Sequence, residues 1–226
     1  MTIKTRIHGM VALAAALTVC GAGRAMAQAA DQAKATAQGE AAAMAKARAD
    51  SVLRPYTDAD VQFMTGMIGH HAQAIVMAGW AESHGASPAV RTLADRIMNA
   101  QRDEIRTMQT WLRDRGKPVP DASSNGTKMV MDGVEHEMLM PGMLTDEQMK
   151  ELDGARGNEF DRLFLTDMIQ HHTGALQMVK TLFDSYGAAQ DDLVFKFASD
   201  VNVDQTTEIA RMRRMLAQVI FGVDAK

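Results

Sequence analysis

The chain of 226 residues contains little cysteine and few aromatic residues. It has 1 Cys, 2 Trp, 2 Tyr and 7 Phe, but 19 Met. Its formal net charge of -4 and the lack of a basic stripe exclude nonspecific binding to nucleic-acid phosphates. The sequence also lacks a P-loop, a G-x-G-x-x-G fingerprint and an ordered Ser-His-Asp triad, so nucleotide-dependent and hydrolytic chemistry have no support. The chain is thus rich in soft, flexible Met side chains and poor in aromatic ones.

Residues 1–27 have the pattern of a secretory signal peptide. A basic start is followed by an apolar run over 10–19 and by the small-residue ending Ala25-Met26-Ala27. The run is too short to span a bilayer. We therefore predict cleavage after Ala27, a location in the periplasm or outside the cell, and no stable membrane anchor. Cleavage takes the formal net charge from -4 to -7, because the segment carries three Lys or Arg and no acidic residue, and it removes Cys20. Thiol catalysis is then excluded, and any soft-metal binding has to use Met and His.

The chain after the signal peptide divides into a leader and two similar halves. Residues 28–54 are Ala-rich with few large apolar side chains, which predicts a flexible or loosely helical leader. From residue 55 onward the sequence repeats. FMTGMIGHH at 63–71 recurs at a spacing of 101 as FLTDMIQHH, and Q-x-x-E-I-x-x-M at 101–108 recurs at a spacing of 104. Such agreement in fixed order indicates a tandem duplication.

Each half is predicted to form a hairpin of long helices. Thr57 with Asp60 resembles a capping box, and the apolar pattern that follows extends to about His84, which we expect at the surface. Ser87 before Pro88 is typical of a second helix start. We assign 55–116 to the first half, 117–143 to the linker and 144–222 to the second half, in which Thr145 starts a short helix before two long ones. The domain 55–222 is therefore predicted to be all-α, a four-helix bundle with a Met-rich connecting loop.

Histidine and methionine side chains share one face of the first long helix in each half. At about 100° per residue, the Met and His side chains around the His-His pair lie within about 140° of one another. The next helix presents a Glu and a Met on one face. The candidate metal ligands of the two halves are Met67, His70, His71, Met77, Glu104 and Met108, and Met168, His171, His172, Met178, Glu208 and Met212.

The linker is a further candidate site because MVMDGVEHEMLMPGM at 129–143 holds five Met and one His. We add His136, Met138, Met140 and Met143 to the candidate ligands, with a Met-rich lid over the bundle as the alternative. Imidazole and thioether groups without thiolates favour copper, Cu(I) through thioethers and either oxidation state through imidazole. Zinc would more often use Cys, or His with carboxylates.

Two other interpretations stay open. In a metal-free structural or interaction bundle, Glu104 and Glu208 would each hydrogen-bond a buried His ring; in a metal protein they are either ligands or orient a His. A ferritin-like di-iron oxidase would need Glu and Glu-x-x-His on paired helices. Each half offers Gln-x-x-Glu instead, so we do not expect an enzyme.

These segments resemble the secreted family called domain of unknown function 305. The resemblance covers about residues 55–220 and rests on the paired M-I-x-H-H-x-x-A-[IL]-x-M segments, the Q-x-x-E-I-x-x-M segments and M-P-G-M. It implies a ferritin-like helical fold and, for some members, copper binding that supports copper tolerance. By this resemblance the ligands here are His70, His71, Met67, Met77, His171, His172, Met168 and Met178. We therefore expect a copper-binding protein that buffers copper or transfers it to a partner protein, with the oxidation state and the oligomeric state left open.

Overall fold

The protein is represented by a computed structural model that describes the backbone of residues 12–52, 55–122, 127–131 and 134–222. The chain divides into two compact units, Met1–Ser51 and Val52–Lys226. The first unit consists, where it is described, of one helix, α1 (Ala12–Val52). The predicted signal peptide and leader stay predictions. None of the helices among the described residues is both long and apolar enough to cross a membrane.

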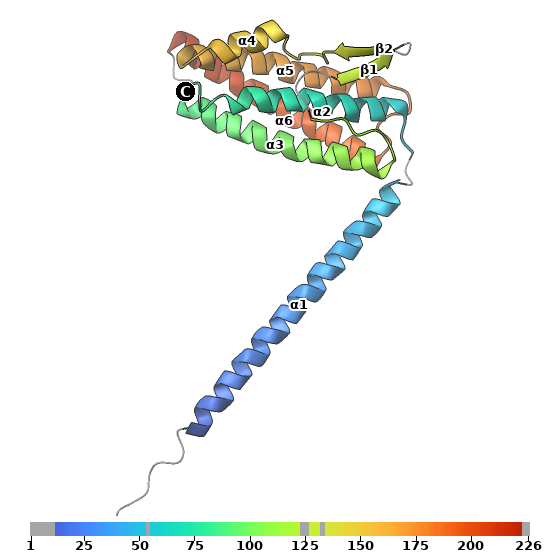
Figure 1. The fold of residues 1–226 in the computed structure, drawn as a ribbon, viewed down its shortest axis with the longest axis vertical. Coiled ribbons are helices and arrows are strands. Elements are labelled where there is room, and N and C mark those ends of the chain that lie inside the picture. Colours follow the sequence, from blue (N-terminus) through green and yellow to red (C-terminus); the bar gives the residue numbers. More distant parts are fainter. Residues whose placement is uncertain (1–11, 53–54, 123–126, 132–133, 223–226) are drawn as a thin grey trace, which may run out of the picture. The chain divides into compact units, whose positions relative to one another are not determined.

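The second unit is built from four long helices that pack as two hairpins (Figure 1). Its elements are α2 (Asp58–Gly79), α3 (Pro88–Asp114), β1 (Thr127–Met131), β2 (Val134–Met138), α4 (Asp146–Gly154), α5 (Asn158–Asp184) and α6 (Asp192–Phe221). Helix α2 packs against α3, α5 packs against α6, and the two hairpins meet where α2 contacts α5. The all-α class is confirmed. The more specific description as a ferritin-like four-helix bundle stays a prediction.

The predicted helix starts are confirmed. Thr57 forms a capping box with Asp60, Thr145 forms one with Gln148, and the Ser87 side chain accepts a hydrogen bond from the backbone of the helix that Pro88 opens. These caps satisfy N–H groups that have no partner within their own helix.

The connection between the hairpins differs from the expected loop. It contains a two-stranded antiparallel sheet, β1–β2, in which Met129 lies opposite His136. The two strands are separated in the sequence by Asp132 and Gly133, a dipeptide typical of two-residue hairpin turns. The sequence analysis predicted a Met-rich connecting loop here and no strand pairing.

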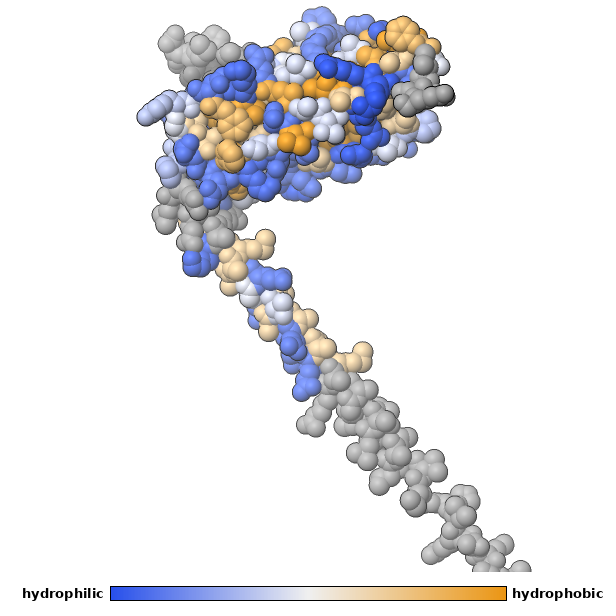
Figure 2. All heavy atoms as spheres, turned by 180° about the vertical axis from the view of Figure 1, so that it is seen from behind, coloured by the Kyte–Doolittle hydropathy of each residue, from blue (hydrophilic) through white to orange (hydrophobic). Residues whose placement is uncertain are grey.

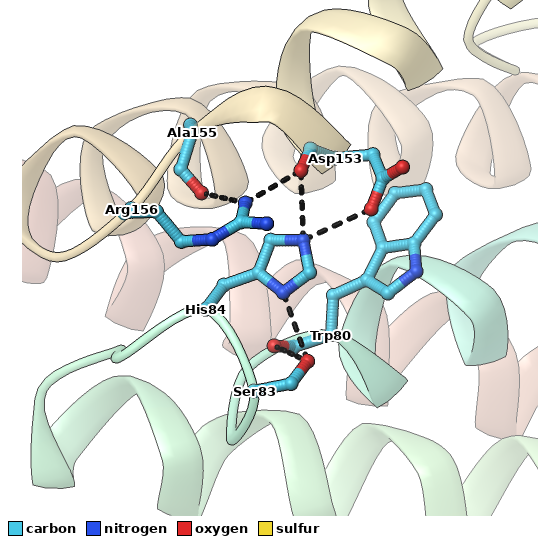
Figure 3. A network of polar contacts seen from close by, with 6 residues as sticks. All are labelled: Trp80, Ser83, His84, Asp153, Ala155 and Arg156. Carbon is cyan, nitrogen blue, oxygen red and sulfur yellow. Dashed lines mark hydrogen bonds and ion pairs between the residues drawn. The ribbon is translucent and has the colours of Figure 1, made fainter.

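The prediction for His84 is wrong, because α2 ends at Gly79 and turns over residues 80–85 place His84 in the interior, 5% exposed. Figure 3 shows its ring held on both sides: Nε2 donates to the backbone oxygen of Asp153 at 2.9 Å, and Nδ1 lies 2.9 Å from Ser83 Oγ. The ring also stacks on Trp80, with centroids 5.8 Å apart. His84 therefore joins the end of α2 to the end of α4.

Two buried aspartates connect the hairpins in the same way. Asp60, at the start of α2, accepts a hydrogen bond of 2.7 Å from Ala189 N in the α5–α6 loop. Asp161, 101 residues later near the start of α5, accepts bonds of 3.1 and 3.2 Å from Ser87 N in the α2–α3 loop. Each hairpin thus anchors the loop of the other, as expected for a duplicated fold.

Part of the apolar surface of the helical unit is exposed. Figure 2 shows a band of hydrophobic residues between hydrophilic ones on one face of this unit. Phe183 at the end of α5 and Phe195 in α6 are 43% and 56% exposed, and their rings pack edge to face at 5.8 Å. The aromatic contact covers the end of the α5–α6 hairpin.

Residues 140–143, which we call the strap, lie directly on α5. A Cβ atom at Gly174 would stand 1.8 Å from the Pro141 oxygen and 2.6 Å from Gly142 Cα. Gln73 fastens the end of the strap, because its Nε2 donates to Leu144 O at 3.0 Å and its Oε1 accepts from Leu144 N at 2.7 Å. The strap can approach α5 this closely because position 174 has no side chain.

We expect Gly174→Ala to destabilise the protein by about 1–3 kcal/mol, because the new methyl group displaces the strap. The control is Gly79→Ala, since a Cβ at Gly79 meets nothing within 4 Å and Ala is the better helix former. Urea unfolding at neutral pH measures both. Equal stability of the two variants would contradict the close packing of the strap.

Candidate metal centre

Four histidine side chains meet in the interior where α2 contacts α5. They are His70 and His71 of α2 and His171 and His172 of α5, and each is 0% exposed. The rings of His70 and His171 have centroids 3.8 Å apart, and the two rings within each pair are 6.2 Å apart. Small buried residues, Ala74 and Ala175, follow the histidines on these helices. The two predicted His-His pairs therefore form one group, which we call the histidine cluster.

Oxygen atoms from three other segments face Nε2 atoms of the cluster. His172 Nε2 donates to Glu208 Oε2 at 2.8 Å. His71 Nε2 lies 2.7 Å from Glu104 Oε2. This is an ion-pair distance, but the two groups are not aligned for a hydrogen bond. His70 Nε2 donates to the Pro141 oxygen of the strap at 3.1 Å. The two glutamate side chains are 21% and 19% exposed, so they form the outer boundary of the cluster.

Several nitrogens of the cluster have no hydrogen-bond partner. The Nδ1 atoms of all four rings and the Nε2 atoms of His71 and His171 are buried without one, as are the side-chain oxygens of Gln101 and Gln205. Leaving such an atom unpaired costs about 1–3 kcal/mol. Buried polar atoms without partners therefore need an explanation, and a bound ion is one. The donor chemistry present, imidazole lone pairs beside thioethers, fits a soft or borderline metal ion.

The environment of His70 and His171 favours the neutral form of their rings. Burial, followed by the neighbouring charge of His71, lowers the pKa of His70 to about 3, although the bond to Pro141 opposes the shift. Burial and the neighbouring His70 lower the pKa of His171 well below its usual value. Both rings are therefore uncharged at neutral pH, and a neutral imidazole is the form that binds a metal ion.

The predicted methionines lie in two buried groups, one toward each end of the histidine positions. Met67, Met108 and Met178 belong to one hydrophobic cluster. The other contains Met77, Met168 and Met212. Each group combines residues from both hairpins. Met67 of α2 is grouped with Met178 of α5, and Met77 of α2 is grouped with Met168 of α5.

The strap adds thioethers to the first methionine group. A Cβ at Gly66 would stand 3.0 Å from Met140 Sδ and 3.4 Å from Met178 Cε, so the glycine makes room for both side chains. Met143 is 5% exposed, and its sulfur faces Met140 N at 3.3 Å. The side chains of His136 and Met138 lie outside the described residues.

The structure thus brings together the four histidines, the two glutamates and the methionines of α2, α3, α5, α6 and the strap, while their role as ligands stays a prediction. In the part of the chain that the structure describes, no group of three or more His, Cys, Asp or Glu side chains is arranged to hold a metal ion. A metal at the cluster would therefore need thioether ligands or a rotation of the rings. The sequence analysis missed the Pro141 oxygen and Gln73. Gln73 corresponds to Gly174 at the repeat spacing of 101. This difference between two otherwise similar segments could have identified Gln73.

Comparison with known proteins places the chain among related helical proteins. The family described as domain of unknown function (DUF305) matches residues 60–216. A DUF305 protein from Streptomyces coelicolor, described as secreted, is 28% identical with a TM-score of 0.60 over 74% of this chain and 96% of that one. CopM in its Cu(II)-bound form is 27% identical with a TM-score of 0.54 over 70% and 96% of the two chains. CopM structures with Cu(I) and with silver bound are similar as well.

A viral protein also shows a partial match. Protein L153 of Acanthamoeba polyphaga mimivirus is 38% identical over 56 residues, which are 25% of this chain and 37% of that protein. The match therefore spans little more than a third of this curated relative. The family match, in contrast, covers most of the second unit, so the resemblance is confirmed: the chain belongs to the DUF305 family.

Proposed function

We propose that this chain is a periplasmic or secreted copper-binding protein that uses His and Met ligands to buffer or transfer copper. The observation that carries the proposal is the histidine cluster, in which four buried Nδ1 atoms have no hydrogen-bond partner beside two groups of buried methionines. The CopM structures with Cu(I) and Cu(II) bound support a copper-related function in this family.

The chemistry of the donors favours copper over the alternatives. Thioethers bind Cu(I) without losing a proton, and neutral imidazole binds either oxidation state. A di-iron oxidase would need more carboxylates than Glu104 and Glu208 supply, and both of these already face histidine nitrogens. Exchange of copper with a partner protein is compatible with thioether ligands, which bind softly.

Export of the chain is supported by the signal-peptide pattern of residues 1–27 and by the relative from Streptomyces coelicolor that is described as secreted. An oxidising compartment suits a mature chain without cysteine, because copper can then be held without thiolates that would oxidise.

We expect the mature chain (28–226) to bind Cu(I) in an anaerobic titration against a competing chelator, and the variant His71→Ala/His172→Ala to lose about 100-fold or more in affinity. Met44→Ala is the matched control, because Met44 is 74% exposed on α1. Retained binding in the histidine variant, with loss in His136→Ala/Met138→Ala, would move the site to the linker. An absence of competitive binding by the wild type, with an unchanged melting temperature, would favour the metal-free bundle.

The metal-free protein should lose stability as the pH falls below about 6.5. The pKa of His70 is about 3 in the folded chain and about 6.5 in an unfolded one, so the unfolded state binds more protons between these values. Each such ring lowers the free energy of unfolding by about 1.4 kcal/mol per pH unit in this range, and His171 acts in the same direction. Above about pH 6.5 these rings are neutral in both states, so they do not change the free energy of unfolding with pH. Urea unfolding of the metal-free wild type and of His70→Gln/His171→Gln between pH 7.5 and 5 measures the effect, and equal slopes would contradict it.

A further inference from the structure

In three of the four rings of the histidine cluster, the two nitrogens have different surroundings. In His70, His71 and His172 the Nε2 atom faces an oxygen, of Pro141, Glu104 and Glu208 respectively. In the same three rings the Nδ1 atom is buried and has no hydrogen-bond partner. The same side of each ring is therefore occupied by a protein oxygen.

The glutamate contacts occur twice, once in each half of the duplicated chain. Glu104 on α3 faces His71, and Glu208 on α6 faces His172. The glutamates are 104 residues apart and the histidines 101, as in the sequence repeat. Each glutamate contacts the second histidine of its pair at a distance of 2.7 or 2.8 Å. The contact has therefore been formed by corresponding residues of both repeats.

Such a contact determines which nitrogen can bind a metal ion. A neutral imidazole carries one N–H group and one lone pair. When Nε2–H faces a carboxylate, the lone pair is on Nδ1, and the carboxylate increases its basicity and holds the ring in place. The carboxylate oxygen that faces Nε2 lies away from Nδ1 of the same ring, so it is not available to a metal ion bound at Nδ1.

We propose that copper binds through Nδ1 of His71 and His172, and that Glu104 and Glu208 are positioning residues that do not contact the metal. This inference rests on the proposed copper binding and names the donor atoms of the same site. Carboxylate oxygens are also poor ligands for Cu(I), which prefers thioether and imidazole donors. The methionines next to the cluster supply the other donors.

The first test observes the ring nitrogens directly. The exported chain is labelled with ¹⁵N-histidine, and its ring nitrogen signals are recorded by long-range ¹H–¹⁵N correlation before and after one equivalent of Cu(I), which is diamagnetic. We expect the Nδ1 signals of His71 and His172 to shift while their Nε2 signals remain those of an N–H group. Loss of the Nε2 proton with a shift of Nε2 would overturn the proposal.

The second test separates positioning from direct binding. Glu104→Ala/Glu208→Ala should lower Cu(I) affinity by about 10–100-fold. Glu104→Gln/Glu208→Gln should recover most of this loss, because an amide oxygen can occupy the place of the carboxylate oxygen that faces Nε2. The control is Glu82→Ala, an exposed residue beyond α2. Equal losses in the Gln and Ala variants would identify the glutamates as ligands, and unchanged affinity in both would exclude a positioning role; either result overturns the proposal.

These outcomes separate the inference from the proposed function. If Cu(I) binds the wild type but the His71 and His172 signals do not change, the inference fails and copper binding stands. If Cu(I) does not bind the wild type, both fail. Melting of each variant without copper shows whether it folds, and the nitrogen experiment on the wild type does not depend on any variant.

Discussion

The close contact between α2 and α5 determines the arrangement of the other elements. Its centre is the pair of rings of His70 and His171, 3.8 Å apart and fully buried. Helices can approach this closely because the positions next in line, Ala74 and Ala175, are small. The approach removes four imidazoles from water, and α3, α6 and the strap then lie where their oxygens can meet the ring nitrogens.

The histidine cluster reduces the stability of the fold, and contacts at the ends of the helices offset this cost. Unpaired Nδ1 atoms are unfavourable in a buried site. Asp60 and Asp161 join each helix start to the loop of the other hairpin, and His84 joins α2 to α4. Buried polar groups that break the rules of a stable core, within a frame that follows them, are typical of a functional site.

Local features of the sequence predicted the helices and the residues of the candidate site. Caps such as Thr57 and Ser87 act on their own helix, and the repeated His-His segments marked the face that α2 and α5 bury. Contacts between distant segments were not predictable in this way. The partner of His84 is 69 residues away, and the acceptor of His70 is a main-chain oxygen, that of Pro141, which no side-chain pattern reveals.

The strap explains why the two halves of the duplication are not equivalent. It occurs once, so His70 has an oxygen at Nε2, whereas His171, its counterpart, has no hydrogen-bond partner at either nitrogen. The repeat departs from symmetry where the strap requires it: Gly174 leaves the space that the strap fills, and Gln73, at the equivalent position, binds the strap's end. Two identical residues at positions 73 and 174 could not leave this space and also bind Leu144. The strap thus fixes the tautomer of His70, whereas no hydrogen bond fixes the tautomer of His171.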